Sequence, residues 1–446
     1  MADTNLVWLR QDLRLDDQPA VAAAADGPFV ALYVLDDETP GKWAIGGAQR
    51  WWLHHSLSAF KHELETRGGA LILRRGRSVD VVRQVAQELG AQTVHATHHY
   101  EPWWSEVETE LGNLLTLHHG DTLLPPERVR TGAGKPFKIY GPFLRAFSAL
   151  CVPEPQTAPE RFAKPANLPA SDRLEDWGLL PTRPNWANGF SLWEPGEQGA
   201  GHHLDRFAAE AADYARRRDL PSEVGTSNLS AHLHFGEISP RRVWHALSSP
   251  EAAKFRKELV WRDFSRSAIL ADPALGEREQ RGRAVRWRSG AEADTDFAAW
   301  TRGRTGYPIV DAGMRQLWLT GWMHNRVRMI TGSFLVKHLL IDWRRGAVWF
   351  WDTLVDADYG NNSLNWQWIA GTGTDSQPFY RIMAPLVQSR KFHAAAYIRR
   401  WVPELSDCSD AEIHEPEKRE SYPESLIGHR EARERAQAAL ARAGAD

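Results

Sequence analysis

The sequence has little of what marks secreted proteins, metal-cluster proteins or membrane proteins. Only two of its 446 residues are cysteine, Cys151 and Cys408, which excludes a disulfide framework and a four-cysteine zinc or iron–sulfur site. No run of about 18 apolar residues is present, so we expect no membrane span. The first residues lack a basic segment followed by an apolar one, which predicts no export signal and a cytoplasmic protein.

Positive charge is not in excess either, because the formal net charge is -3 at pH 7. A partner rich in phosphate must therefore be attracted by a local basic face. Tryptophan, in contrast, is abundant, with 21 residues against 9 tyrosines. Indole rings need packing and a partner for the N–H group, so most of them are expected in a core. Only position along the chain can identify a functional subset.

The first part of the chain alternates short apolar runs with amphipathic stretches. This pattern predicts a parallel sheet with helices on its faces. No G-x-G-x-x-G motif follows the first apolar run, so the pattern alone does not indicate dinucleotide binding. The apolar runs lie at 6–9, 29–35, 70–73 and 93–96, with helical patterns at 48–66 and 79–89.

The composition changes twice further along. Prolines recur from Pro136 to Pro195, which is typical of a stiffened connection with short helical pieces. We predict an α/β, Rossmann-like antenna domain at 1–130, a linker at 131–200 and an all-α domain at 201–446. The clearest helical patterns lie at 208–218, 240–247, 255–270, 307–320, 325–340 and 344–354, and a terminal surface helix is expected within 415–446.

Several ordered motifs resemble those of the photolyase/cryptochrome family. The longest are residues 306–317 (GYPIVDAGMRQL) and 320–329 (TGWMHNRVRM), followed by 356–362 (DADYGNN) and 366–368 (WQW). Shorter matching motifs lie at 7–14, 225–230, 235–240 and 258–262. The resemblance covers nearly the whole chain in order.

The resemblance implies light-driven repair of cyclobutane pyrimidine dimers by a carbon–carbon lyase. Residues 322–326 (WMHNR) and Met329 are similar to the dimer-repairing branch, whereas the branch that repairs (6-4) photoproducts has a histidine pair where His324 and Asn325 stand. The implied partner is UV-damaged DNA, double- or single-stranded, and the implied form is a monomer. The alternatives are a cryptochrome, which senses light without repair, and a helical DNA-binding protein without chemistry.

The resemblance also implies a helical domain that binds flavin adenine dinucleotide (FAD). Thr226, Ser227 and Ser230 offer hydroxyl groups that suit a pyrophosphate, although an ordinary helix cap also explains them. Asn362 is expected to face flavin N5, where plant cryptochromes have aspartate, and asparagine favours the reduced anionic flavin that repair needs. Arg328 and Asp356 are expected to form an ion pair beside the isoalloxazine, with Tyr214, Leu229, Phe255, Arg262 and Asp358 as further contacts.

A pocket for the dimer is implied by the same resemblance. Trp261 and Trp368 would form flat apolar walls, and Met329 would fill the irregular gap between them. Glu258 and Asn325 would read base edges, and these two are the candidate catalytic residues together with Asn362. The expected contacts to DNA phosphates, which position DNA without reading its sequence, are Arg218, Arg326, Arg381 and Gln388.

Three tryptophans, Trp366, Trp343 and Trp287, match the electron relay of the family. Aromatic rings ionise more readily than aliphatic groups, so a relay from the surface to a flavin has to be built from them. Core packing is the default interpretation of any three among 21 tryptophans. The flanking motifs identify Trp366 and Trp343, whereas the segment that follows Trp287 is longer than in typical relatives.

Two places depart from the family pattern. Asn228 stands where most relatives have arginine, which removes a cation near the flavin loop. Trp103 and Trp104 stand where folate-binding relatives have an Asn-Glu pair. The antenna chromophore is therefore open: methenyltetrahydrofolate stacked on Trp103 or Trp104 is the first expectation, and a deazaflavin or no antenna are the alternatives.

Overall fold

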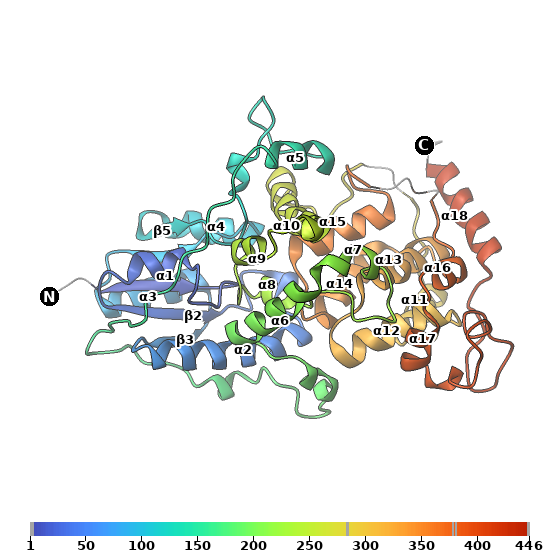
Figure 1. The fold of residues 1–446 in the computed structure, drawn as a ribbon, viewed down its shortest axis with the longest axis horizontal. Helices are drawn as coiled ribbons and strands as arrows, with labels where there is room; N and C mark the ends of the chain where they lie inside the picture. Colours follow the sequence, from blue (N-terminus) through green and yellow to red (C-terminus); the bar gives the residue numbers. More distant parts are fainter. Residues whose placement is uncertain (1–3, 282–284, 377–378, 380, 444–446) are drawn as a thin grey trace.

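A computed structural model describes residues 4–281, 285–376, 379 and 381–443. Its N-terminal part holds a five-stranded parallel sheet of order β3-β2-β1-β4-β5, which confirms the predicted α/β class (Figure 1). The four predicted strands are present with small shifts in their ends. The strands are β1 (Asn5–Leu9), β2 (Phe29–Leu35), β3 (Leu71–Arg75), β4 (Val94–Thr97) and β5 (Leu115–His118).

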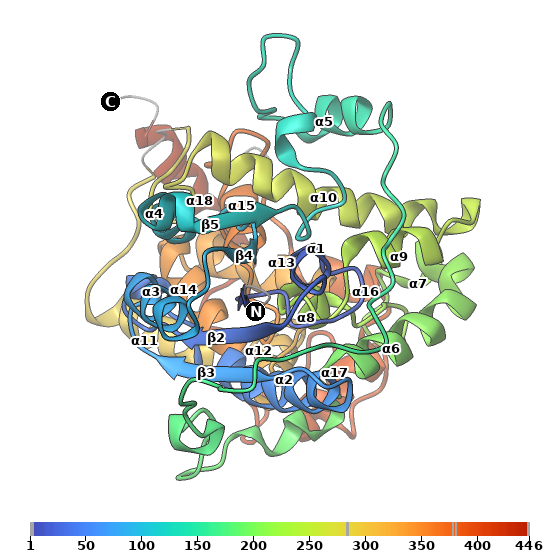
Figure 2. The same ribbon diagram turned by 90° about the vertical axis from the view of Figure 1, so that its left-hand side faces the viewer.

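Alternate residues of the central strands pack into two different cores. Val7 and Ala31 pack with α1 (Pro19–Ala24) and α2 (Gly47–Thr66). Their chain neighbours Trp8 and Leu32 pack with α3 (Ser78–Leu89) and α4 (Pro102–Leu111). Successive side chains of a strand point to opposite faces, so helices cover both faces of this sheet (Figure 2).

The sequence pattern does not predict β5, α1 or α4. β5 is a four-residue edge strand in which Thr116 and Leu117 are exposed, so it lacks an apolar run. α1 has only six residues, too few for a 3.6-residue period to be visible. These elements are recognisable only from their pairing and packing.

The remaining part of the described chain is helical, which confirms the second half of the fold prediction (Figure 1). The helices are α5 (Tyr140–Phe147), α6 (Glu197–Glu210), α7 (Tyr214–Arg217), α8 (Ser230–His234), α9 (Pro240–Ala246), α10 (Ala253–Ala271), α11 (Ala291–Thr301), α12 (Pro308–Thr320), α13 (Asn325–Ser333), α14 (Trp343–Thr353), α15 (Tyr359–Ala370), α16 (Pro385–Lys391), α17 (Ala395–Trp401) and α18 (His429–Ala443).

Two helical predictions need correction. The pattern at 208–218 is broken, because α6 ends at Glu210 and only the short α7 follows. The pattern at 325–340 is a helix to Ser333 that continues as a π-helical turn, Phe334–His338. The terminal helix α18 lies within the predicted range, exposes most of its residues and buries Ala432, Ala436 and Ala439 on one face.

The proline-rich segment packs along both halves of the molecule. Phe143 and Phe147 enter the core of the helical part, whereas Phe162 and Phe190 enter the core beside β1 and α2. The segment therefore holds the halves together through buried aromatic rings. The boundaries at 130 and 200 stay a prediction.

Helix α2 fixes the α/β part against the helices that carry the site. The Trp52 indole N–H donates to Glu237 Oε1 at 2.9 Å, and both side chains are buried. Gln49 donates through Nε2 to the carbonyl of Trp351 and accepts through Oε1 from His234 Nε2, each at 3.0 Å. A side chain of the first domain thus sets the orientation of His234.

Candidate functional site

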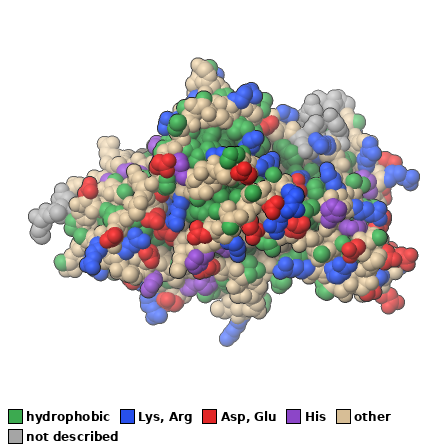
Figure 3. Space-filling model, viewed as in Figure 1, with side chains coloured by type: hydrophobic (Ala, Val, Ile, Leu, Met, Phe, Trp, Pro, Cys, Tyr) green, Lys and Arg blue, Asp and Glu red, His purple; other side chains and the backbone are tan. Residues whose placement is uncertain are grey.

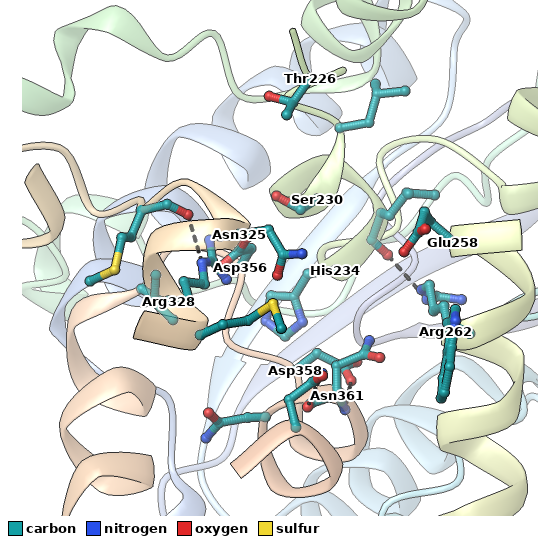
Figure 4. A pocket seen from close by; sticks show the side chains of 18 of the residues that line it. Thr226, Ser230, His234, Glu258, Arg262, Asn325, Arg328, Asp356, Asp358 and Asn361 are labelled. Carbon is teal, nitrogen blue, oxygen red and sulfur yellow. Dashed lines mark hydrogen bonds and ion pairs between the residues drawn. The ribbon is translucent and has the colours of Figure 1, made fainter. Parts of the chain in front are cut away.

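A cavity of about 580 Å³ lies among helices α8, α10, α13 and α15. Figure 4 shows labelled side chains from these helices and from the segment between α14 and α15 reaching the same space. The volume lies within the range of roughly 300–1,000 Å³ that is typical of small-molecule sites. The predicted site residues that line it are Tyr214, Arg218, Thr226, Ser227, Leu229, Ser230, Phe255, Glu258, Trp261, Arg262, Asn325, Arg326, Arg328, Met329, Asp356, Asp358, Asn362, Trp366 and Trp368.

Four predicted residues lie outside the lining of this cavity: Arg381, Gln388, Trp343 and Trp287. Arg381 is exposed, and its backbone carbonyl accepts a hydrogen bond from Lys337. Gln388 is half-buried on α16. DNA phosphates would contact the protein at its surface, where both side chains are at least partly exposed. The structure does not test these contacts, so the two roles stay predictions.

The expected ion pair of Arg328 and Asp356 is present. Two parallel hydrogen bonds join the guanidinium to the carboxylate, at 3.1 Å and 2.8 Å, and the Arg328 Nε donates to the carbonyl of Met323. The Asp356 side chain is only 4% exposed. A bidentate pair of this kind fixes the guanidinium plane against the cavity.

A second buried charge network crosses from the α/β part to the cavity. Asp121 contacts Arg262 and Arg266 of α10, and Arg266 bonds in turn to Asp358 at 2.7 Å. Burial opposes ionisation of Asp121, but the two guanidinium groups outweigh burial and hold the pKa of Asp121 far below its ordinary value. Asp121 and Arg266 were not predicted, because residues about 140 positions apart carry no local signal of their contact.

Asp358 also forms the N-cap of α15. Its Oδ1 accepts from the backbone N–H of Asn361 at 2.8 Å, which satisfies a free donor of the first turn. Burial raises the pKa of Asp358, but Arg266 and then Arg262 overcome that effect, and the net shift is downward. Asp358 is therefore an anion held at a defined place in the cavity lining.

His234 is a lining residue that the sequence did not suggest. It is 4% exposed, and its Nε2–H donates to Gln49, so Nδ1 of the neutral ring is an acceptor. That Nδ1 has no protein partner among the described residues. A buried acceptor beside a cavity is satisfied if the bound molecule carries hydroxyl or N–H donors, as the ribityl chain of FAD does.

The loop before α8 presents hydroxyl groups to the same cavity. The backbone of Asn228 lies in the left-handed region with φ 57°, a conformation that asparagine adopts more readily than most residues. Its side-chain oxygen accepts from the Thr226 hydroxyl at 3.3 Å. The departure from the family's arginine at this position therefore suits the turn, although it removes a positive charge.

Asn362 has only part of its amide free for a ligand. Its Nδ2 donates to the carbonyl of Ala347 at 3.0 Å. Because a carbonyl can only accept, this bond fixes which end of the amide is the NH₂ group. The side-chain oxygen and one N–H remain for the cavity.

The residues predicted to receive a dimer also line the cavity together. Glu258 and Trp261 come from α10, Asn325 and Met329 from α13, and Trp368 from α15. Glu258 contacts the guanidinium of Arg218, and Arg326 bonds to Asp219 at 2.7 Å. Two of the predicted phosphate contacts are thus already paired with carboxylates. Figure 3 shows Lys and Arg side chains over the helical part, interspersed with Asp and Glu.

Trp366 has the position that the last tryptophan of an electron relay needs, directly beside the cavity. It lines the cavity and is 2% exposed. Its ring packs beside Gly346 of α14 and Gly332 of α13 and meets Phe350 at 5.0 Å between ring centroids. Trp343 is one turn before Gly346 and fully buried, and Trp287 is half-buried, with its N–H donating to Glu279 at 3.3 Å.

Replacing Gly346 with alanine is expected to destabilise the protein by about 1–3 kcal/mol, the usual cost of overpacking a core. A Cβ at this position would lie 2.2 Å from Trp366 Cη2, and the ring is enclosed. Urea unfolding measures the loss. Gly141→Ala is the matched control, because its Cβ would meet only Arg145, at 4.0 Å. Equal stability of both variants would contradict the tight packing of Trp366.

The two tryptophans considered for an antenna are engaged in packing. Trp103 is buried with its ring edge against Tyr359, and Trp104 packs against Trp8 under the guanidinium of Arg10. Neither residue lines the cavity described above or either of two smaller cavities, one beside Arg217 and one beside Phe264. The packing of the two indoles does not identify an antenna chromophore, and its identity stays open.

Acidification is expected to weaken the fold through buried histidines. Burial lowers the pKa of His234 and of His324 from 6.5 to about 4. Between pH 6.5 and about 4 the unfolded chain therefore binds protons at these histidines, whereas the folded chain does not. The free energy of unfolding is therefore highest above this pH window and decreases through it as the pH falls. The free energy of unfolding, measured across the window, should fall for the wild type and fall less for His234→Gln. Parallel profiles would contradict this assignment.

None of the described helices combines the length and apolar character that a membrane crossing needs. Within the same residues no cluster of His, Cys, Asp or Glu side chains could hold a metal ion. A parallel α/β domain joined to helices that enclose a cavity with paired charges and a free acceptor defines a protein with a built site for a small polar molecule.

Comparisons with known proteins identify the family. Residues 5–161 match the family described as DNA photolyase, and residues 255–442 match the FAD binding domain of DNA photolyase. A deoxyribodipyrimidine photo-lyase of Agrobacterium fabrum is 44% identical over 98% of this chain and 97% of its own length. The crystal structure of a bacterial class III photolyase from Agrobacterium tumefaciens superposes with a TM-score of 0.95 at 43% identity, covering 100% of this chain and 98% of that one.

Cryptochrome-1 of Arabidopsis thaliana is also similar, at 34% identity over 98% of this chain and 70% of its own length. The chain therefore belongs to the photolyase/cryptochrome family, and its helical part is the family's FAD-binding domain. The resemblance seen in the sequence motifs is confirmed. The residues present fit FAD, because the cavity supplies hydroxyls, paired charges and the unpaired acceptor of His234.

Proposed function

We propose that this protein repairs cyclobutane pyrimidine dimers in DNA in a light-dependent reaction. One observation carries the proposal: a single cavity is lined both by residues that suit FAD and by the full set expected to hold a dimer. Two binding sites that share one cavity bring a light-absorbing cofactor into contact with its substrate.

Within this proposal the flavin contacts come from four places. Thr226, Ser227 and Ser230 would hold the pyrophosphate, and Arg328 with Asp356 would lie beside the ring system. Asp358 and His234 would face the ribityl hydroxyls, and Asn362 would face N5. Bound FAD would supply light absorption and the electron for repair.

The part of the cavity that would receive the dimer needs both flat apolar surfaces and polar groups. Trp261 and Trp368 would receive the faces of the two fused bases, with Met329 between them. Photolyases take the target nucleotide out of the stack, at a cost of a few kcal/mol that is smallest for a damaged base. Glu258 and Asn325 would then bond to the base edges that lose their Watson–Crick partners.

The alternative, a cryptochrome-type sensor, is weaker on one point of chemistry. The amide of Asn362 is not a titratable group. Unlike an aspartate, it can neither give a proton to the flavin nor take one from it. A neutral group at this place suits a reduced anionic flavin, which repair needs.

The decisive experiment is repair of an oligonucleotide that contains one thymine dimer, under blue light, with a dark control and a (6-4) photoproduct alongside. Light-dependent loss of the dimer, and of the dimer alone, is the expected result. A purified protein that contains FAD and leaves both lesions intact would favour the sensor.

Glu258→Ala is expected to lower the repair yield by about tenfold, the effect of a stabilising interaction of roughly 1.4 kcal/mol lost during the reaction. Affinity for dimer DNA should change less, because the indole walls remain. Yield at saturating DNA and the dissociation constant measure the two quantities separately. Glu251→Ala, on an exposed turn before α10, is the control. An unchanged yield would remove Glu258 from the reaction.

A further inference from the structure

The indole of Trp261 presents only one free face to the cavity. The other face is covered by the phenol ring of Tyr140, with 3.6 Å between ring centroids and 8° between ring planes. Trp261 lines the cavity, whereas Tyr140 is not part of its lining. Tyr140 therefore lies behind the indole as seen from the cavity.

Tyr140 is itself held at three points. Its backbone N–H donates to Asp375 Oδ2 at 2.8 Å, at the start of α5. Its hydroxyl donates to the carbonyl of Lys257, one turn before Trp261 on α10, at 2.9 Å. Phe264 packs against its ring edge at 5.7 Å. A ring fixed from α5, α10 and the loop after α15 cannot turn freely, so it is a rigid support.

We propose that Tyr140 is a positioning residue for the part of the cavity that would receive the dimer. It holds the indole plane of Trp261 so that the free face stays ready for a pyrimidine of the dimer. This inference rests on the proposed function. An indole without this support could rotate about its side-chain torsions, and binding would then have to order it again. Among the described residues Trp261 has a stacked aromatic partner and Trp368 has none, so Tyr140 supports one of the two indole walls.

The test compares affinity for a duplex with one thymine dimer and for the same undamaged duplex, using the FAD-loaded protein. Tyr140→Leu should weaken dimer binding about 3- to 10-fold, the range that loss of an aromatic pair implies. Binding of undamaged DNA should not change, because phosphate contacts remain. Tyr140→Phe keeps the stacked ring and should bind dimer DNA nearly as the wild type does. Tyr307→Leu, another half-buried tyrosine whose hydroxyl bonds to a carbonyl, is the control.

A double-mutant cycle separates positioning from general destabilisation. In a Trp261→Ala background Tyr140→Leu should add no further loss of dimer affinity, because the supported ring is gone. The proposal is overturned if Tyr140→Leu binds dimer DNA as tightly as the wild type, weakens both duplexes equally, or adds its full loss in the Trp261→Ala background. A wild type without preference for dimer DNA would instead refute the proposed function.

Discussion

Trp366→Phe is expected to slow light-driven reduction of bound FAD by an order of magnitude or more. Phenylalanine ionises much less readily than tryptophan, so the step nearest the cavity would lose its electron donor. Phenylalanine still fills most of the space beside Gly346 and Gly332, so the flavin should remain bound. The bleaching of the oxidised flavin absorption under blue light, with an external thiol as reductant, measures the effect.

Repair by chemically reduced enzyme is the internal control for this variant, because it needs no relay. It should stay close to the wild-type level. Trp177→Phe is a matched control, since Trp177 is also buried but belongs to the core beside β1 and α2. Equal loss of photoreduction and of repair by the reduced enzyme would contradict the relay role of Trp366.

Asp121→Ala should lower the free energy of unfolding by about 3–5 kcal/mol, the usual cost of removing one partner from a buried ion network. The substitution leaves Arg262 and Arg266 buried without their shared carboxylate, and arginine cannot lose its charge to relieve this. Flavin content of the purified protein should fall as well, because Arg266 holds Asp358 at the cavity. Urea unfolding and the flavin absorption of the purified variant measure both effects.

Asp407→Ala is the control for that variant. Asp407 also pairs with an arginine, Arg419, but both side chains face solvent, where an ion pair adds little stability. It should unfold like the wild type. If Asp121→Ala had the same free energy of unfolding and the same flavin content as the wild type, the buried network would not be needed for the cofactor cavity.

The cavity depends on side chains from distant parts of the chain. Asp121 comes from the segment after β5, and Gln49 of α2 orients His234. The α/β part therefore contributes to the shape of the cofactor site although no residue of β1 to β5 lines it. This is a physical reason for the two domains to act as one unit.

Much of the site could be predicted because it lies in short motifs. Glu258 and Trp261 share α10, Asn325 and Met329 share α13, and their spacing of three or four residues places each pair on one helix face. The ion pair of Arg328 with Asp356 followed from the family resemblance and is formed. The buried strands β1 to β4 were readable from their apolar runs.

The sequence by itself determined the strand–helix alternation of the first part, the helical second part and most of the residues that line the cavity, because strand and helix periods and contiguous motifs are local properties. Only the tertiary structure decided that Asp121 pairs with Arg266, that His234 keeps a free acceptor and that Tyr140 supports Trp261. Each of these contacts joins segments far apart in the chain. Whether a polar or aromatic side chain is buried, paired or free depends on which segments pack around it, and no local pattern records that.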